Sequence, residues 1–85
     1  MPTATAAHPE SRTSHEAQKL FQLGMKCASG RSVPADMISA HMWFNIAALR
    51  GNAEAARLRR EIAEEMSEVE IAAAQRAARE WVMHH

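Results

Sequence analysis

Residues 23–55 read LGMKCASGRSVPADMISAHMWFNIAALRGNAEA, and this stretch contains two apolar segments that are separated by a short polar connection. Within each segment apolar residues recur at three- and four-residue spacing, which is the period of an α-helix. Gly30 and Gly51 follow the two segments, and glycine commonly ends helices because it adopts a left-handed backbone conformation at little cost. The stretch therefore predicts a helical hairpin. The predicted helices span residues 15–28 and 35–50.

The sequence after Gly51 predicts a second pair of helices with narrower apolar stripes. Asn52 is suited to cap the first of them, because its side-chain oxygen can accept a hydrogen bond from a free backbone N–H. Ser67 and Glu70 have the spacing of a capping box, which predicts the start of the second. The predicted helices span residues 53–65 and 68–82.

Four helices with very short connections predict an all-α fold of two antiparallel helical hairpins, stacked as a short α-solenoid. Residues 1–14 are rich in Thr, Ala, Ser and Pro and lack a helical period, so we expect a disordered N-terminal tail. The expected helical domain spans residues 15–83, with a first hairpin at residues 15–51 and a second, capping hairpin at residues 52–83.

Charge and composition narrow the classes of function. Ten acidic residues balance ten basic residues in this chain of 85, so the formal net charge is zero. A basic excess is typical of nucleic-acid binders, and its absence disfavours that function. No apolar run has the length of a membrane span. The lone Cys27 cannot form an intramolecular disulfide, which fits a reducing compartment, so we expect a cytoplasmic protein.

Residues 23–55 resemble the Sel-one-like repeat family, which is related to the tetratricopeptide repeats. The motif positions keep the spacing of the family, with Cys27 replacing the usual aromatic residue and Ser32 replacing a loop glycine. The positions that carry the resemblance are Leu23, Gly24, Cys27, Gly30, Ser32, Val33, Asp36, Ala40, Trp43, Phe44, Ala47, Ala48, Gly51 and Ala55. The resemblance implies that eight of these form the structural core of the repeat: Leu23, Gly24, Ala40, Trp43, Phe44, Ala47, Ala48 and Gly51.

This resemblance implies a scaffold or adaptor that binds another protein and has no catalytic residues, metal or cofactor of its own. Repeat hairpins bury their apolar faces against neighbouring repeats, so self-association as a homodimer is an alternative. An accessory regulatory subunit is a further alternative, and nucleic-acid binding is the least favoured.

A groove between the first and third helices is the expected binding surface, with Met42 as an additional contact. The residues expected to face the partner are Gln22, Met25, Lys26, Ser29 and Met42. Several apolar residues of the hairpin do not all fit on one buried face of their helices. Such extra apolar surface indicates either an interface or packing against other segments of the chain. They are Met25, Met37, Met42, Ile46 and Leu49.

Two clusters suggest chemistry, and both have simpler explanations. Cys27 and His41 lie on adjacent predicted helices, but the family pattern places Cys27 in the core, so a metal site is not expected. The glutamates from position 61 to position 70 flank a helix junction on a polar face, with Arg57 and Arg60 nearby. They therefore predict a solvated face with helix-surface pairs such as Arg57–Glu61 and not an acid–base site.

Overall fold

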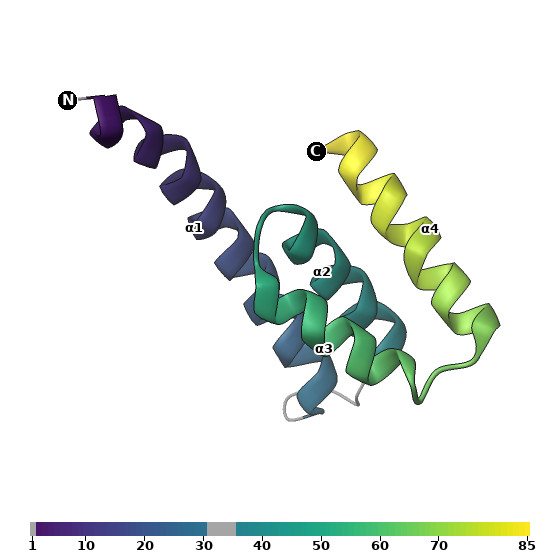
Figure 1. The fold of residues 1–85 in the computed structure, drawn as a ribbon. Helices are drawn as coiled ribbons and strands as arrows, with labels where there is room; N and C mark the ends of the chain where they lie inside the picture. Colours follow the sequence, from purple (N-terminus) through teal and green to yellow (C-terminus); the bar gives the residue numbers. More distant parts are fainter. Residues whose placement is uncertain (1, 31–35) are drawn as a thin grey trace.

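The four predicted segments are helical in the computed structural model, which describes the backbone of residues 2–30 and 36–85 and the side chains of residues 15–30 and 36–85. Successive helices run in roughly opposite directions (Figure 1), and the described residues contain no strand. The predicted all-α fold class with four helices is confirmed. The helices are α1 (Pro2–Ser29), α2 (Met37–Leu49), α3 (Ala53–Ala63) and α4 (Glu68–His84).

Side-chain caps fix where α2, α3 and α4 begin. Asp36 precedes α2 and accepts hydrogen bonds from the backbone N–H and the hydroxyl of Ser39, at 3.0 and 2.7 Å. Asn52 accepts from the backbone N–H three residues later at 2.8 Å, as predicted for α3. The capping box of Ser67 and Glu70 is complete, with both hydrogen bonds present. These caps satisfy N–H groups that lack partners within the helix.

Two glycines fix where α1 and α2 end. Gly30 follows α1 with φ 70° and Gly51 follows α2 with φ 109°, so both positions use the left-handed region in which a side chain is strained. The connection after Gly30 is closed by the backbone N–H of Asp36, which donates to the carbonyl of Cys27 at 2.9 Å. The predicted loop at residues 31–34 lies outside the described residues.

The start of α1 differs from the predicted boundary. The sequence predicts a helix from about His15, whereas α1 begins at Pro2 and continues through residues 2–14. Alanine has the highest helix propensity, and positions 4, 6 and 7 are alanines. Extension of an existing helix also needs no new nucleus, so the backbone can continue beyond the part of α1 that packs on α2.

The central helix is α2, because α1, α3 and α4 each pack against it and make few contacts with one another. The sequence of α2 explains this position, since apolar residues occupy nearly its whole circumference. A helix that is apolar on all sides is buried on all sides. Its buried residues are Ala40, His41, Phe44, Ile46 and Ala47.

Close packing between α1 and α2 centres on Gly24 and Phe44. A Cβ atom at Gly24 would lie only 2.6 Å from two ring carbons of Phe44, so the ring packs directly against the backbone of α1. The ring of Phe21 lies beside it, with centroids 5.7 Å apart and planes tilted by 46°. Gly24 of the Leu-Gly pair and Phe44 of the Trp-Phe pair therefore determine how closely α1 approaches α2.

The eight predicted core residues of the repeat differ in burial. Gly24, Ala40, Phe44 and Ala47 are buried, Trp43 and Ala48 are half-buried against the core, and Gly51 forms the turn. Leu23 is the correction: it is 39% exposed. Phe44 packs against α1 at Gly24, so the neighbouring side chain of Leu23 is directed to the side of the interface.

The second pair of helices packs through small residues. Ala55 of α3 and Ala74 and Ala78 of α4 are buried, which lets both helices approach α2 closely. Trp43 of α2 and Trp81 of α4 pack edge to face, with centroids 5.6 Å apart. Since α3 and α4 contact each other little, each is held mainly by α2.

Candidate functional site

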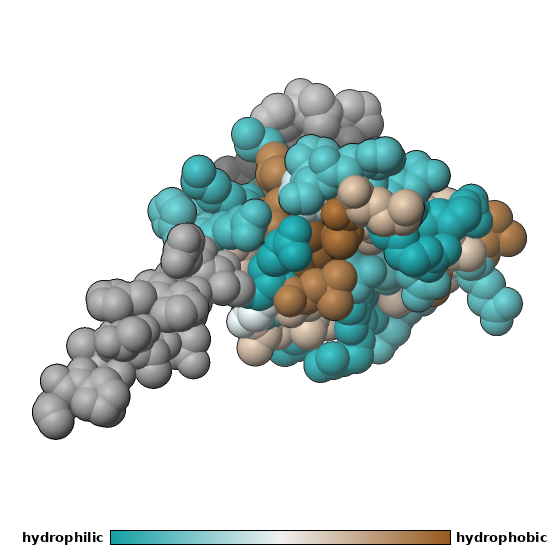
Figure 2. Space-filling model, turned by 90° about the horizontal axis from the view of Figure 1, so that it is seen from above, coloured by the Kyte–Doolittle hydropathy of each residue, from teal (hydrophilic) through white to brown (hydrophobic). Residues whose placement is uncertain are grey.

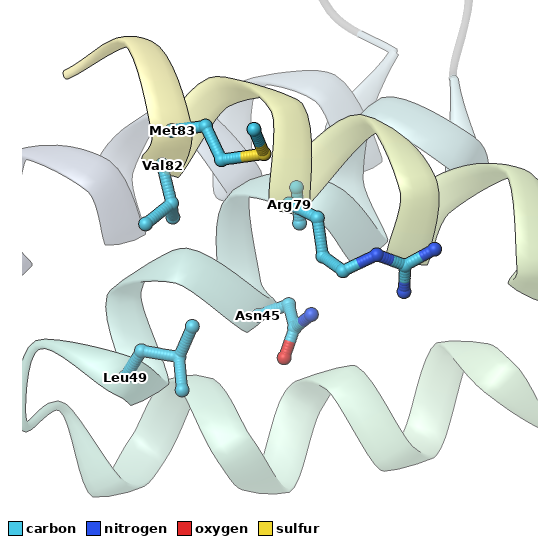
Figure 3. Close-up of a pocket in the computed structure, with 6 residues that line it drawn as sticks. Asn45, Leu49, Arg79, Val82 and Met83 are labelled. Atoms are coloured by element: carbon cyan, nitrogen blue, oxygen red, sulfur yellow. The ribbon is translucent and has the colours of Figure 1, made fainter.

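A pocket with a mainly apolar lining opens between α2 and α4. Its volume is about 240 Å³. An engineered cavity of about 150 Å³ is enough to hold benzene, so this pocket accommodates one large side chain. The side chains of Leu49 and Val82 point into the space between the two helices (Figure 3). The lining residues are Asn45, Leu49, Ala78, Arg79, Val82 and Met83.

Large apolar side chains remain exposed at the mouth of this pocket. Leu49 is 66% exposed and Met83 is 79% exposed. The C-terminal ends of α2 and α4 lie at the upper side of Figure 1, and Figure 2 views the molecule from that side. It shows an apolar patch flanked by hydrophilic surface. Patches of this kind mark surfaces that bind other molecules.

The polar groups around the pocket are basic or neutral. Arg79 lines the pocket and is exposed, and it forms no ion pair with any residue that the structure describes. Asn45 also lines the pocket, and its side-chain oxygen accepts a hydrogen bond from the half-buried Arg59 of α3 at 2.6 Å. Among the described residues that line the pocket there is no carboxylate. The site therefore combines an apolar interior with an arginine at its edge.

His41 is a buried polar group on the same central helix. Its side chain is only 4% exposed, and its Nδ1 atom has no hydrogen-bond partner among the described residues. Burial lowers the pKa of His41, and the positive charge of Arg59 lowers that pKa further. Both effects favour the neutral imidazole over the positively charged imidazolium.

Four of the five residues predicted to face a partner lie on the exposed side of α1. Gln22, Met25 and Lys26 are exposed, and the hydroxyl of Ser29 donates to the carbonyl of Lys26 at 3.1 Å. The fifth, Met42, lies on α2 and is half-buried against the core.

Beside these residues lies a shallow hollow of about 350 Å³. It is lined by Lys19, Gln22, Leu23 and Lys26, which all belong to α1. The predicted groove was to be shared with α3, but no residue of α3 lines this hollow, and α1 and α3 contact each other little.

The surplus apolar residues divide between core and surface. Ile46 is fully buried and Met37 is half-buried, so neither contributes to an exposed patch. Met25 and Leu49 are exposed. Sequence reasoning singled out Leu49 but missed Val82 and Met83, because no local signal shows that the end of α4 lies beside α2.

Outside the pocket, the groups that could carry chemistry are the thiol of Cys27, the ion pairs of Arg57 and the side chains that can bind metals. Cys27 is half-buried, and its burial raises the pKa of its thiol. The nearby negative charge of Asp36 raises that pKa further. Arg57 pairs with Glu61, as predicted, and also with Glu54. Among the described side chains no three His, Cys, Asp or Glu residues gather closely enough to bind a metal. None of the helices, over the residues searched, combines the length and apolarity needed to cross a membrane.

Comparisons of the chain with protein-family models, with curated proteins and with solved structures found no match. The candidate site therefore rests on the geometry of the α2–α4 pocket.

Proposed function

We propose that this chain is a non-catalytic protein–protein interaction module of the Sel-one-like repeat type, and that it binds its partner at the α2–α4 pocket. The observation that carries this proposal is the pocket itself, whose apolar interior continues into exposed Leu49 and Met83 at its mouth. Burial of apolar surface is the main favourable contribution to protein association. A buried anchor side chain in a pocket is also the usual centre of binding energy.

The repeat assignment is supported by the parts that the motif residues play in the fold. Gly24 permits the close approach of Phe44, and Gly51 provides the turn between α2 and α3. These positions are the ones that the resemblance identifies.

A second candidate function is self-association, in which another copy of this chain occupies the pocket. The observation that favours it is the large exposure of apolar residues in a small domain, since isolated repeat hairpins need neighbours to bury their faces. An accessory or regulatory subunit would use the same pocket on a different partner.

Photo-crosslinking tests the proposal with a matched control on the same helix. Met83 lies at the pocket and Val69 lies near the other end of α4, and both are 79% exposed. A photoreactive phenylalanine replaces each residue in turn, and the protein is irradiated in the cells that express it. We expect a discrete adduct with another protein from position 83 and none from position 69. Equal adducts or none from position 83 contradict the proposal, and an adduct of two copies of this chain selects self-association.

A further inference from the structure

We infer that the partner of the α2–α4 pocket is a helix that presents a large apolar side chain with a carboxylate one turn away. This inference rests on the proposed function and specifies the chemistry of the partner. The apolar side chain enters the pocket, and the carboxylate lies beside Arg79.

The charge of the site points to an acidic partner. Arg79 is the charged residue of the lining, and it forms no ion pair within the described residues. Two of the described arginines have carboxylate partners: Arg50 lies 3.5 Å from Glu16, and Arg57 pairs with two glutamates. The remaining described arginines form no ion pair with described residues, and of these Arg79 is the one that lines the pocket. The pocket thus has a cation whose complementary charge is not supplied by the described part of the chain.

The groups behind the pocket strengthen this preference. Arg59 is half-buried, and its partner Asn45 is neutral. Burial lowers the pKa of His41, and the nearby positive charge of Arg59 lowers it further, as expected for a cation beside a second basic group. A carboxylate placed at the mouth would be attracted by the guanidinium group of Arg79, whereas a basic residue there would be repelled by it.

The geometry favours a helix over an extended segment. The described residues contain no strand, so they offer no sheet edge to which an extended peptide could add. The pocket lies between two helices of a fold in which every helix packs on a helical neighbour. A helix also places an apolar residue and a carboxylate three or four positions apart on one face, which matches a pocket with a cation at its edge.

Selection from a displayed library provides the test. The probe is a library of helical peptides of about 15 residues with one randomised face, selected against the folded chain. Selected peptides are then measured by fluorescence anisotropy. We expect Leu, Met, Phe or Trp to be enriched together with Glu or Asp three or four positions away, and Arg79→Glu should weaken these peptides by about fivefold or more.

Two control variants make the outcomes separable. Lys26→Glu changes the charge by the same amount on α1, away from the pocket, and should alter affinity by less than about twofold. Leu49→Glu should abolish binding, while circular dichroism confirms that each variant folds. Selection against the Arg79→Glu protein should enrich Lys or Arg in place of the acidic residue.

The opposite results overturn the inference in distinguishable ways. Peptides that require Leu49 but show no acidic preference contradict the partner chemistry and leave the proposed function intact. Peptides that bind independently of Leu49, or a selection that yields no binder, contradict both. If sedimentation shows that the chain self-associates at micromolar concentration and that Leu49→Glu abolishes this association, the occupant of the pocket is a second copy of the chain and not a separate partner.

Discussion

Gly24→Ala tests whether the contact between α1 and Phe44 determines the packing of the central helix. The new Cβ would lie 2.6 Å from two carbons of the Phe44 ring and 3.1 Å from a third. Ordinary carbon contacts lie at about 3.5–4.0 Å, so the ring or α1 must move by about 1 Å. Phe44 is only 1% exposed and is enclosed by other core residues, so it has little room to move.

Two opposing contributions set the magnitude for this substitution. Overpacking of a well-filled core costs about 1–3 kcal/mol, whereas alanine is favoured over glycine within a helix by about 1 kcal/mol. We therefore expect the free energy of unfolding to fall by about 1 kcal/mol, which lowers Tm by about 4–8 °C in a domain of this size. Urea unfolding followed by circular dichroism measures the change.

The matched control is the same substitution in a Phe44→Leu background. Leucine lacks the ring that the new Cβ would meet, so Gly24→Ala should there be neutral or stabilising, with a coupling of about 1–2 kcal/mol between the two positions. Equal destabilisation in both backgrounds, or stabilisation of the wild-type protein, would refute the proposed contact between Phe44 and the backbone of α1.

Three further predictions concern stability. Ser67→Ala removes half of the capping box, so it should lower the free energy of unfolding by about 1 kcal/mol in urea titrations. Burial lowers the pKa of His41 in the folded state, so the stability that the neutral imidazole contributes is fully present above the ordinary pKa of 6.5 and is lost as the pH falls below it. The free energy of unfolding should therefore fall less between pH 7.5 and pH 5.0 in His41→Leu than in the wild-type protein. Met83→Ser should leave Tm nearly unchanged because Met83 is 79% exposed, and the change in free energy should stay within about 0.5 kcal/mol.

Local signals predicted much of the fold. The capping box at Ser67 and Glu70, the cap at Asn52 and the two positive-φ glycines each act within one helical turn, and all four occur where the sequence places them. The buried alanines also follow from helical periodicity. These features depend on neighbours in sequence, which is why a single sequence reveals them.

Features that depend on the arrangement of helices were predicted less well. Leu23 was predicted in the repeat core but is 39% exposed, and Met42 is half-buried against the core. Helical periodicity identifies a face, but α2 is covered by three helices, and its sequence does not state which neighbour covers which side. The pocket formed with Val82 and Met83 belongs to the same class of feature, because it exists only through the placement of α4 beside α2.

Methyl chemical shifts recorded during titration with the crosslinked partner, or with the tightest selected peptide, test the central claim most directly. The two candidate surfaces carry distinct methyl groups, with Leu49, Val82 and Met83 at the pocket and Leu23 and Met25 on α1. The proposed docking site predicts that the pocket methyls shift and saturate together while the α1 methyls stay unchanged. Saturable shifts confined to Leu23 and Met25 would place the binding surface on α1 and contradict the account.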